Sequence, residues 1–124
     1  MATNATSRLT GAALKRHRLV YVYTDGTLLH CPAGGMCVGS LQEGAPADTF
    51  AADTPVSPDA IEYGKEVVLE AGEVLAVGEF FKAGAYGGAD GYAVKDSTKT
   101  VNTLGVVRQA AAAAGAKFRA EYAK

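Results

Sequence analysis

The sequence predicts an all-β fold, a compact sandwich or barrel of short strands with at most one short helix. Two observations predict it. Short runs of β-branched and aromatic residues alternate with polar residues, as half-buried strands do, and turn signals rich in glycine separate these runs. The length of 124 residues suits one domain with one core.

The bulk composition excludes several classes of protein. The net charge is −1, so the chain as a whole is not built to bind nucleic acid. No apolar run approaches the roughly 20 residues of a membrane helix, and the N-terminus lacks the apolar stretch of a signal peptide. We therefore expect a protein made in the cytoplasm, with neither a nucleic acid nor a membrane as partner.

Residues 1–18 differ in texture from the rest of the chain. They begin small and polar and end in the basic run LKRHR. Because this segment has little power to form a core, we expect a flexible basic N-terminal arm, followed by a single β-domain over residues 19–124. Four positive charges favour an acidic neighbouring surface, although a solvated tail is an open alternative. The candidate partner-binding residues are Arg8, Lys15, Arg16 and Arg18.

The first strands of the β-domain flank an Asp-Gly dipeptide. In RLVYVYTDGTLLHC (18–31) the dipeptide Asp25-Gly26 separates two apolar runs, which predicts a tight hairpin with both central residues at positive φ. MCVGSL (36–41) is a further short strand. Residues 42–60 hold three prolines among small polar residues and predict a long surface loop.

The second half of the sequence repeats the same kinds of signal. Asp90-Gly91, in the glycine-rich run FFKAGAYGGADGYAV (80–94), predicts another tight hairpin turn. QAAAAAGAKF (109–118) is either one helical turn ended by Gly115 or a connection of small residues. Strands are expected over Val67–Leu69, from Phe80–Lys82 onward, and over Tyr92–Val94, Leu104–Arg108 and Lys117–Tyr122.

A faint internal repeat links the two parts. Asp25-Gly26 and Asp90-Gly91 are 65 residues apart, while Gly39 and Gly105 are 66 apart, so one insertion reconciles them. In each copy an Asp-Gly turn leads to a strand with an apolar-glycine step and then to a glutamine. Two similar halves and a chance similarity both fit this pattern.

No catalytic, cofactor-binding or metal site is predicted. The glycines of residues 80–94 fit neither a dinucleotide fingerprint nor a phosphate-binding loop, because a strand pattern and not a helix follows them. His30, Cys31 and Cys37 are too few for a structural zinc site, and His30 and Cys31 point to opposite faces of a strand. The cysteines are expected to be small buried hydrophobic residues. Lys82 lacks the flanking residues of a carrier-domain lysine.

Two stretches resemble a family of small phage and prophage capsid decoration proteins, also called head cement proteins. They are EVLAVGEFFKAGAYGGADGYAV (73–94) and TLGVVRQAAAAAG (103–115), and the likeness extends loosely over most of residues 19–124. The resemblance implies a non-enzymatic structural protein of the virion. It implies attachment to the outside of the capsid, with the major capsid protein as partner and a homo-oligomer, expected to be a trimer.

Two alternatives remain open at this point. One is a tail or baseplate adaptor with a similar fold. The other is a small carrier or enzyme domain that uses Cys31 or Lys82. The basic arm and residues 42–60 have no counterpart in the family, so the mode of attachment does not follow from the resemblance.

Overall fold

The computed structural model describes residues 7–42 and 49–123, and within them the chain is all β, with no helix. The predicted fold class is confirmed. The alanine-rich segment 109–118 is the connection of small residues and not the helical turn, because Ala111 forms an antiparallel bridge with Leu75.

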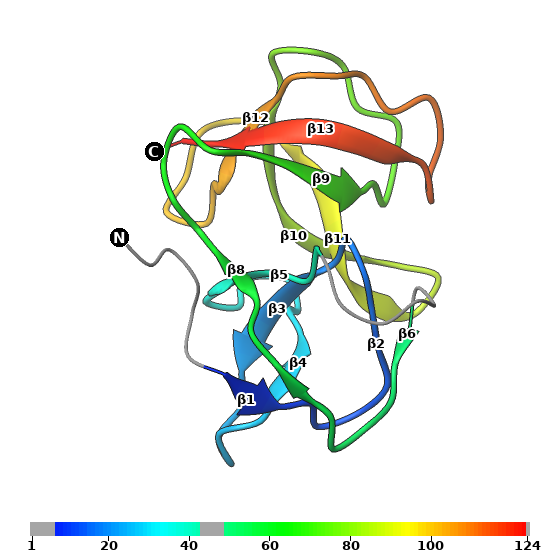
Figure 1. Ribbon diagram of the computed structural model, residues 1–124. Helices are drawn as coiled ribbons and strands as arrows, with labels where there is room; N and C mark the ends of the chain where they lie inside the picture. The colour runs from blue at the N-terminus through cyan, green and yellow to red at the C-terminus, as the bar shows by residue number, and fades with distance from the viewer. Residues whose placement is uncertain (1–6, 43–48, 124) are drawn as a thin grey trace.

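The strands divide into two lobes (Figure 1). The lower lobe in that view comes from the first half of the chain, the upper lobe from the second half. The first lobe contains β1 Arg8–Leu9, β2 Leu14–Lys15, β3 Leu19–Val22, β4 Leu28–His30, β5 Gly39–Ser40, β6 Thr49–Phe50, β7 Pro55–Val56 and β8 Asp59–Ala60. The second contains β9 Glu66–Glu70, β10 Phe80–Tyr86, β11 Ala89–Asp96, β12 Gly105–Val107 and β13 Lys117–Tyr122.

The second lobe is a small closed barrel. Its sheet has the order β11-β10-β12-β13-β9, and all these pairs are antiparallel. A parallel bridge between Ala71, just after β9, and Ala93 of β11 joins the two edges of the sheet. Closure leaves no long unpaired edge in this lobe.

The first lobe has the same topology. Its sheet order is β4-β3-β5-β8, which matches β11-β10-β12-β13. Val20 pairs with Gly39 as Phe81 pairs with Gly105. Strands β7 and β8 together occupy the place of β13, and Pro58 lies between them, where the missing amide proton removes a ladder hydrogen bond.

The backbone constraints of the two lobes agree in detail. A Cβ added to Gly39 would lie 2.1 Å from the carbonyl oxygen of Asp59, and one added to Gly105 would lie 2.0 Å from that of Glu121. A parallel bridge between Thr10 and Leu28 matches the one that closes the second barrel. The faint sequence repeat therefore reflects two similar halves and not a chance similarity.

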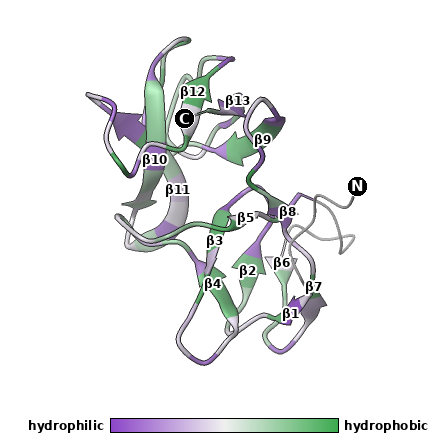
Figure 2. Ribbon diagram, turned by 90° about the vertical axis from the view of Figure 1, so that its left-hand side faces the viewer, coloured by the Kyte–Doolittle hydropathy of each residue, from purple (hydrophilic) through white to green (hydrophobic). Residues whose placement is uncertain are grey.

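The buried hydrophobic residues form two clusters, one within the first lobe and a larger one that holds the core of the second lobe together with Leu19 and Cys31 of the first. Each of the six residues of the smaller cluster has a counterpart in the second lobe. Figure 2 shows hydrophobic residues on strands of both lobes. The buried core of the first lobe is Leu14, Val20, Leu28, Leu41, Phe50 and Val56. The corresponding buried residues of the second lobe are Leu75, Phe81, Ala93, Val107, Ala111 and Phe118.

The expectation of a loosely held arm is wrong for residues 8–18. This segment forms β1, which pairs with β7, and β2, which pairs with β6. Leu14 is fully buried in the first core, so the lobe begins at residue 8 and not at 19. The segment's own sequence does not show this, because the partner of Leu14 in the core is Phe50, far along the chain. Residues 1–6 lie outside the described part of the chain.

The long loop expected over residues 42–60 is also wrong for residues 49–60. Three short strands, β6, β7 and β8, occupy this segment and complete the first barrel. Strands of two residues are too short to show an alternating pattern, and the prolines concealed them further. Residues 43–48 lie outside the described part of the chain.

The predicted turn at Asp25-Gly26 is confirmed, with one correction to its geometry. The amide of Gly26 donates to the carbonyl of Tyr23 at 2.9 Å, and the amide of Tyr23 donates to that of Thr27 at 2.8 Å. Of the two central residues only Gly26 has positive φ, at 87°. This is the pattern of a three-residue hairpin loop that ends in a bulge glycine.

The predicted turn at Asp90-Gly91 is wrong. The tip of the β10–β11 hairpin is Gly87-Gly88, where both residues have positive φ and Tyr86 pairs with Ala89. Gly91 lies inside β11 at φ 88°, the same backbone state as Gly26. The connection between the paired strands is seven residues long in the second lobe, 85–91, and three residues long in the first, 24–26. Gly91 therefore forms the bulge that corresponds to Gly26, and the hairpin of the second lobe is longer by four residues.

Candidate docking surface

The structure distributes the four predicted partner-binding cations over the first lobe. Arg8, exposed on β1, donates to the carbonyl oxygen of Gly26 at 3.2 Å. Lys15 is exposed on β2, while Arg16 is half-buried in the turn that follows. The structure thus brings Arg8 and Gly26 together, but the four cations do not lie on one free arm.

Arg18 is a buried contact between the lobes. Its Nε lies 2.8 Å from Oε1 of Glu70, and these side chains are only 7% and 19% exposed. Its guanidinium carbon lies 3.9 Å from the ring centroid of Tyr92, whose hydroxyl accepts a hydrogen bond from Nη2. Arg18 directly precedes β3 of the first lobe and contacts β9 and β11 of the second, and it is not available to a partner.

Further polar contacts fix the lobes against each other. The amide of Glu70 donates to the carbonyl of His17 at 2.9 Å, and the amide of Gly91 donates to the carbonyl of Cys31 at 3.0 Å. The Ser40 and Tyr122 hydroxyls lie 3.3 Å apart, and burial raises the pKa of Tyr122 to about 12. These contacts make the lobes one packed unit.

His30 lies in the same region in its neutral form. Its Nε2 accepts a hydrogen bond from the Lys15 amide at 3.2 Å. Burial, with a smaller contribution from the nearby charge of Arg18, lowers the pKa of His30 from 6.5 to about 4. A positive charge here would lose its water and face the guanidinium, so His30 is uncharged at neutral pH.

The two cysteines form a disulfide, which corrects the expectation of separate buried thiols. Cys31 and Cys37 are bonded, with their Cα atoms 5.8 Å apart. The bond closes the short loop 32–36 at the end of β4. Among the described residues no cluster of three or more His, Cys, Asp and Glu side chains could hold a metal ion.

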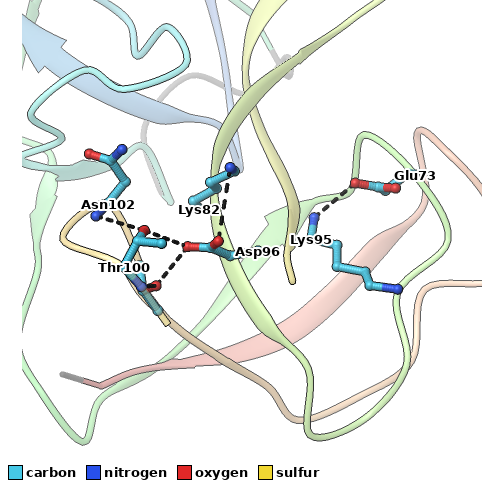
Figure 3. A network of polar contacts seen from close by, with 7 residues as sticks. Glu73, Lys82, Lys95, Asp96, Thr100 and Asn102 are labelled. Atoms are coloured by element: carbon cyan, nitrogen blue, oxygen red, sulfur yellow. Dashed lines mark hydrogen bonds and ion pairs between the residues drawn. The ribbon is translucent and has the colours of Figure 1, made fainter. Parts of the chain in front are cut away.

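A hydrogen-bonded carboxylate closes the corresponding loop of the second lobe (Figure 3). Asp96 ends β11 and is almost fully buried. Its Oδ2 accepts from the hydroxyls of Thr100 at 2.9 Å and Thr103 at 2.7 Å, while Lys82 Nζ lies 3.9 Å from Oδ1. The Asn102 amide donates to the Thr100 hydroxyl at 3.2 Å, so the loop 97–102 is held by its own polar side chains.

The two closures occupy equivalent positions. The backbone amide of Cys31 donates to the carbonyl of Leu19 in the first lobe, and at the equivalent position of the second lobe Asp96 pairs with Phe80. Cys37 precedes Val38, whose amide donates to the Val20 carbonyl of β3 at 3.0 Å. In the same way Thr103 precedes Leu104, whose amide donates to the Phe81 carbonyl of β10 at 2.9 Å. A disulfide in one lobe and a hydroxyl–carboxylate hydrogen bond in the other therefore fix corresponding loops.

These two loops form the walls of a pocket of about 400 Å³ between the lobes. Residues 34–37 line one side, residues 101–104 line the other, and Ile61 and Tyr63 of the segment that joins the lobes complete it. Three lining side chains are apolar and strongly exposed: Met36 at 87%, Val101 at 99% and Tyr63 at 62%. We call this feature the interlobe pocket.

Sequence reasoning did not find the interlobe pocket. Val101 stands alone in the polar run KDSTKTVNT (95–103), where an isolated apolar residue has no core to join. That was the one available signal. The pocket itself depends on two loops, residues 34–37 and 101–104, that lie far apart in the sequence and meet only in the folded chain.

Other exposed apolar residues lie elsewhere. Val74 and Val77 project from the loop between β9 and β10. Glu79 accepts the Ala76 amide in this loop, a bond that lowers the pKa of its carboxyl. A second hollow of about 300 Å³, beside the β10–β11 tip, includes His30 and Asp90 in its lining.

The geometry defines a class of protein: a two-lobed β-protein, formed of similar halves, with an uncharged pocket at their junction. No protein-family model matches the sequence, and no curated protein matches it. The fold is similar to the crystal structure of the head fiber gp8.5 N base in bacteriophage phi29, with a TM-score of 0.73 and 13% sequence identity. The similarity covers 95% of this chain and 92% of that chain. No helix in the described residues is long and apolar enough to cross a membrane.

Proposed function

We propose that this protein is a structural component of a bacteriophage virion that attaches to the outer surface of the capsid. The observation that carries the proposal is the fold similarity to a phage head fiber base over almost the whole of both chains. A match of 95% and 92% coverage includes both lobes and their mutual arrangement, not a single barrel that many unrelated proteins share.

The finer role that we propose is that of a decoration or cement protein. Its partner is the major capsid protein, and the functional unit is a homo-oligomer, expected to be a trimer. Many copies on a regular lattice reinforce one another through avidity, so each copy needs only a modest contact. Such a role requires surface and stability but no catalytic group, which makes the protein non-enzymatic.

The features that suggested a carrier or thiol enzyme do not support that alternative. The Cys31 thiol is consumed in the disulfide with Cys37. Lys82 lies in the middle of β10, within 3.9 Å of Asp96, whereas a carrier lysine stands at a hairpin tip. A tail or baseplate adaptor differs from a decoration protein in copy number, which the first experiment measures.

The first experiment is quantitative mass spectrometry of purified virions. We expect a fixed ratio to the major capsid protein that is close to one or to a simple fraction of it. A handful of copies per virion would indicate an adaptor, and absence from the virion would refute the proposal. The mass of the purified protein in solution tests the trimer.

The contribution of the exposed cations needs point variants and not truncation. Deleting residues 2–18 would remove Leu14 from the first core, and any loss of binding would then report misfolding. Arg8→Ala and Lys15→Ala leave the core intact. If these cations contact the capsid, both variants should bind heads more weakly at low salt, and the difference should shrink as salt rises.

A further inference from the structure

The interlobe pocket has the composition of a contact site for an uncharged partner. None of the described residues that line it carries a charge. A charged group entering it would lose water and meet no opposite charge. Met36, Tyr63 and Val101 are strongly exposed apolar side chains that gather at this one pocket, and a gathered apolar patch marks an interaction site.

The walls of the pocket are fixed before any partner arrives. The Cys31–Cys37 disulfide holds the loop that carries Met36. The Asp96 hydrogen bonds to Thr100 and Thr103 hold the loop that carries Val101. A preformed site binds more tightly than a mobile one, because less conformational entropy is lost on binding.

The size and exposure of the rim favour a protein surface over a small molecule. A small ligand inside a pocket of about 400 Å³ would leave the outward-facing parts of Met36, Tyr63 and Val101 in water. A protein surface with one apolar projection fills the pocket and covers the rim together. Two identical concave pockets facing each other would remain unfilled, so a symmetric pocket-to-pocket contact fits poorly. Occupation of the pocket by a different face of a neighbouring copy would appear in the oligomeric mass, which the test measures.

We infer that the interlobe pocket receives an uncharged apolar projection of the capsid shell, and that it is the docking site of the protein on the head. This inference rests on the proposed function, since it names the surface through which that function operates. The exposed apolar side chains and fixed walls of the pocket suit a binding site in which a few side chains dominate affinity.

The test measures binding to purified heads that lack this protein, by co-sedimentation over a range of protein concentrations. Val101→Asp and Met36→Asp place a carboxylate at the rim of the uncharged pocket. Each should weaken head binding at least about tenfold, the effect typical of a hot-spot residue. Val101 is 99% exposed, so its replacement should leave the melting temperature unchanged.

Val77→Asp is the matched control. It introduces the same charge at an exposed valine, 61% accessible, that does not line the pocket. It should bind heads within about twofold of the unmodified protein, because surface substitutions away from a contact have small effects. The oligomeric mass of all three variants is measured in parallel and should not change.

The outcomes separate this inference from the proposed function. If the unmodified protein does not bind heads at all, the proposed function fails. If it binds, and Val101→Asp and Met36→Asp bind equally well, the docking site lies elsewhere and the inference is overturned. If either variant lowers the oligomeric mass, the pocket is occupied by a second copy, which also overturns it.

Discussion

Replacing Arg18 by alanine should destabilise the protein strongly, because this side chain forms a largely buried ion pair between the lobes. Its Nε lies 2.8 Å from Glu70 Oε1, with side chains 7% and 19% exposed. Its removal leaves the Glu70 carboxylate without a partner, removes the hydrogen bond to the Tyr92 hydroxyl and opens the stacked contact on that ring.

The expected magnitude follows from those losses. Breaking a buried ion pair from one side costs about 3–5 kcal/mol. Glu70 keeps some access to water, so we expect the lower part of this range, about 3 kcal/mol, as the loss in free energy of unfolding. Arg18→Lys keeps the charge but loses the planar stacking and the second hydrogen bond, and should fall between the alanine variant and the unmodified protein.

Chemical denaturation followed by circular dichroism measures the effect, and Arg108→Ala is its control. Arg108 forms an ion pair of nearly the same length with Glu121, 2.9 Å, but the two side chains are 45% and 27% exposed. Exposed pairs contribute about 0–1 kcal/mol. If Arg18→Ala costs no more than Arg108→Ala, the buried pair does not hold the lobes together and the reasoning is wrong.

Three further predictions follow from the same structure. The pKa of His30 is about 4 in the folded protein and about 6.5 in the unfolded chain, so the unfolded chain takes up a proton first as the pH falls. The free energy of unfolding should therefore decrease by about 2–3 kcal/mol from pH 7 to about pH 4.5. Chemical denaturation at both pH values tests this, and His30→Gln should make the free energy of unfolding less dependent on pH. Gly91→Ala should destabilise the protein by about 1–3 kcal/mol more than Gly64→Ala. Both glycines have positive φ, but only at Gly91 would an added Cβ meet the backbone, 2.9 Å from the Leu19 carbonyl oxygen. Equal melting temperatures of the two variants would contradict this. Gly105→Ala should lower the free energy of unfolding by about 1–3 kcal/mol or more, because the added Cβ would overlap the carbonyl oxygen of Glu121 on the neighbouring strand. A melting temperature equal to that of the unmodified protein would exclude this clash.

The strands of the second lobe could be predicted from the sequence because they are long enough to show a pattern. The strand predicted over Lys117–Tyr122 has those bounds in the structure, and its residues alternate between buried and less buried positions. The first lobe uses several strands of two residues, which carry no period at all. Their existence depends on partners supplied from elsewhere in the chain.

The same dipeptide led to one right and one wrong prediction for a physical reason. Asp-Gly marks a position where the backbone enters the left-handed region, and Gly26 and Gly91 both do so, at φ 87° and 88°. Whether that position ends a hairpin or forms a bulge inside one depends on how many paired residues follow. The Gly87-Gly88 turn decides this in the second lobe. The disulfide was missed in a similar way, since it requires two Cα atoms to be brought to 5.8 Å by folding.

The faintness of the internal repeat has its own explanation in the cores. The first lobe has large side chains at Leu28 and Phe50, where the second has Ala93 and Ala111. The second lobe has aromatic rings in place of two valines: Phe81 for Val20 and Phe118 for Val56, with the two rings in edge-to-face contact at 6.4 Å.

Such exchanges change almost every residue of the core while the strand framework around it stays the same. A glycine whose Cβ position is already occupied by a backbone oxygen has no such freedom. Gly39 and Gly105 are in that situation, and they are among the positions at which the two halves still match in the sequence. The loop closures differ in another way, because the Cys31–Cys37 disulfide and the Asp96–Thr103 hydrogen bond hold corresponding loops by different chemistry. This is expected if both lobes must keep the walls of the pocket fixed but need not keep the particular residues that fix them.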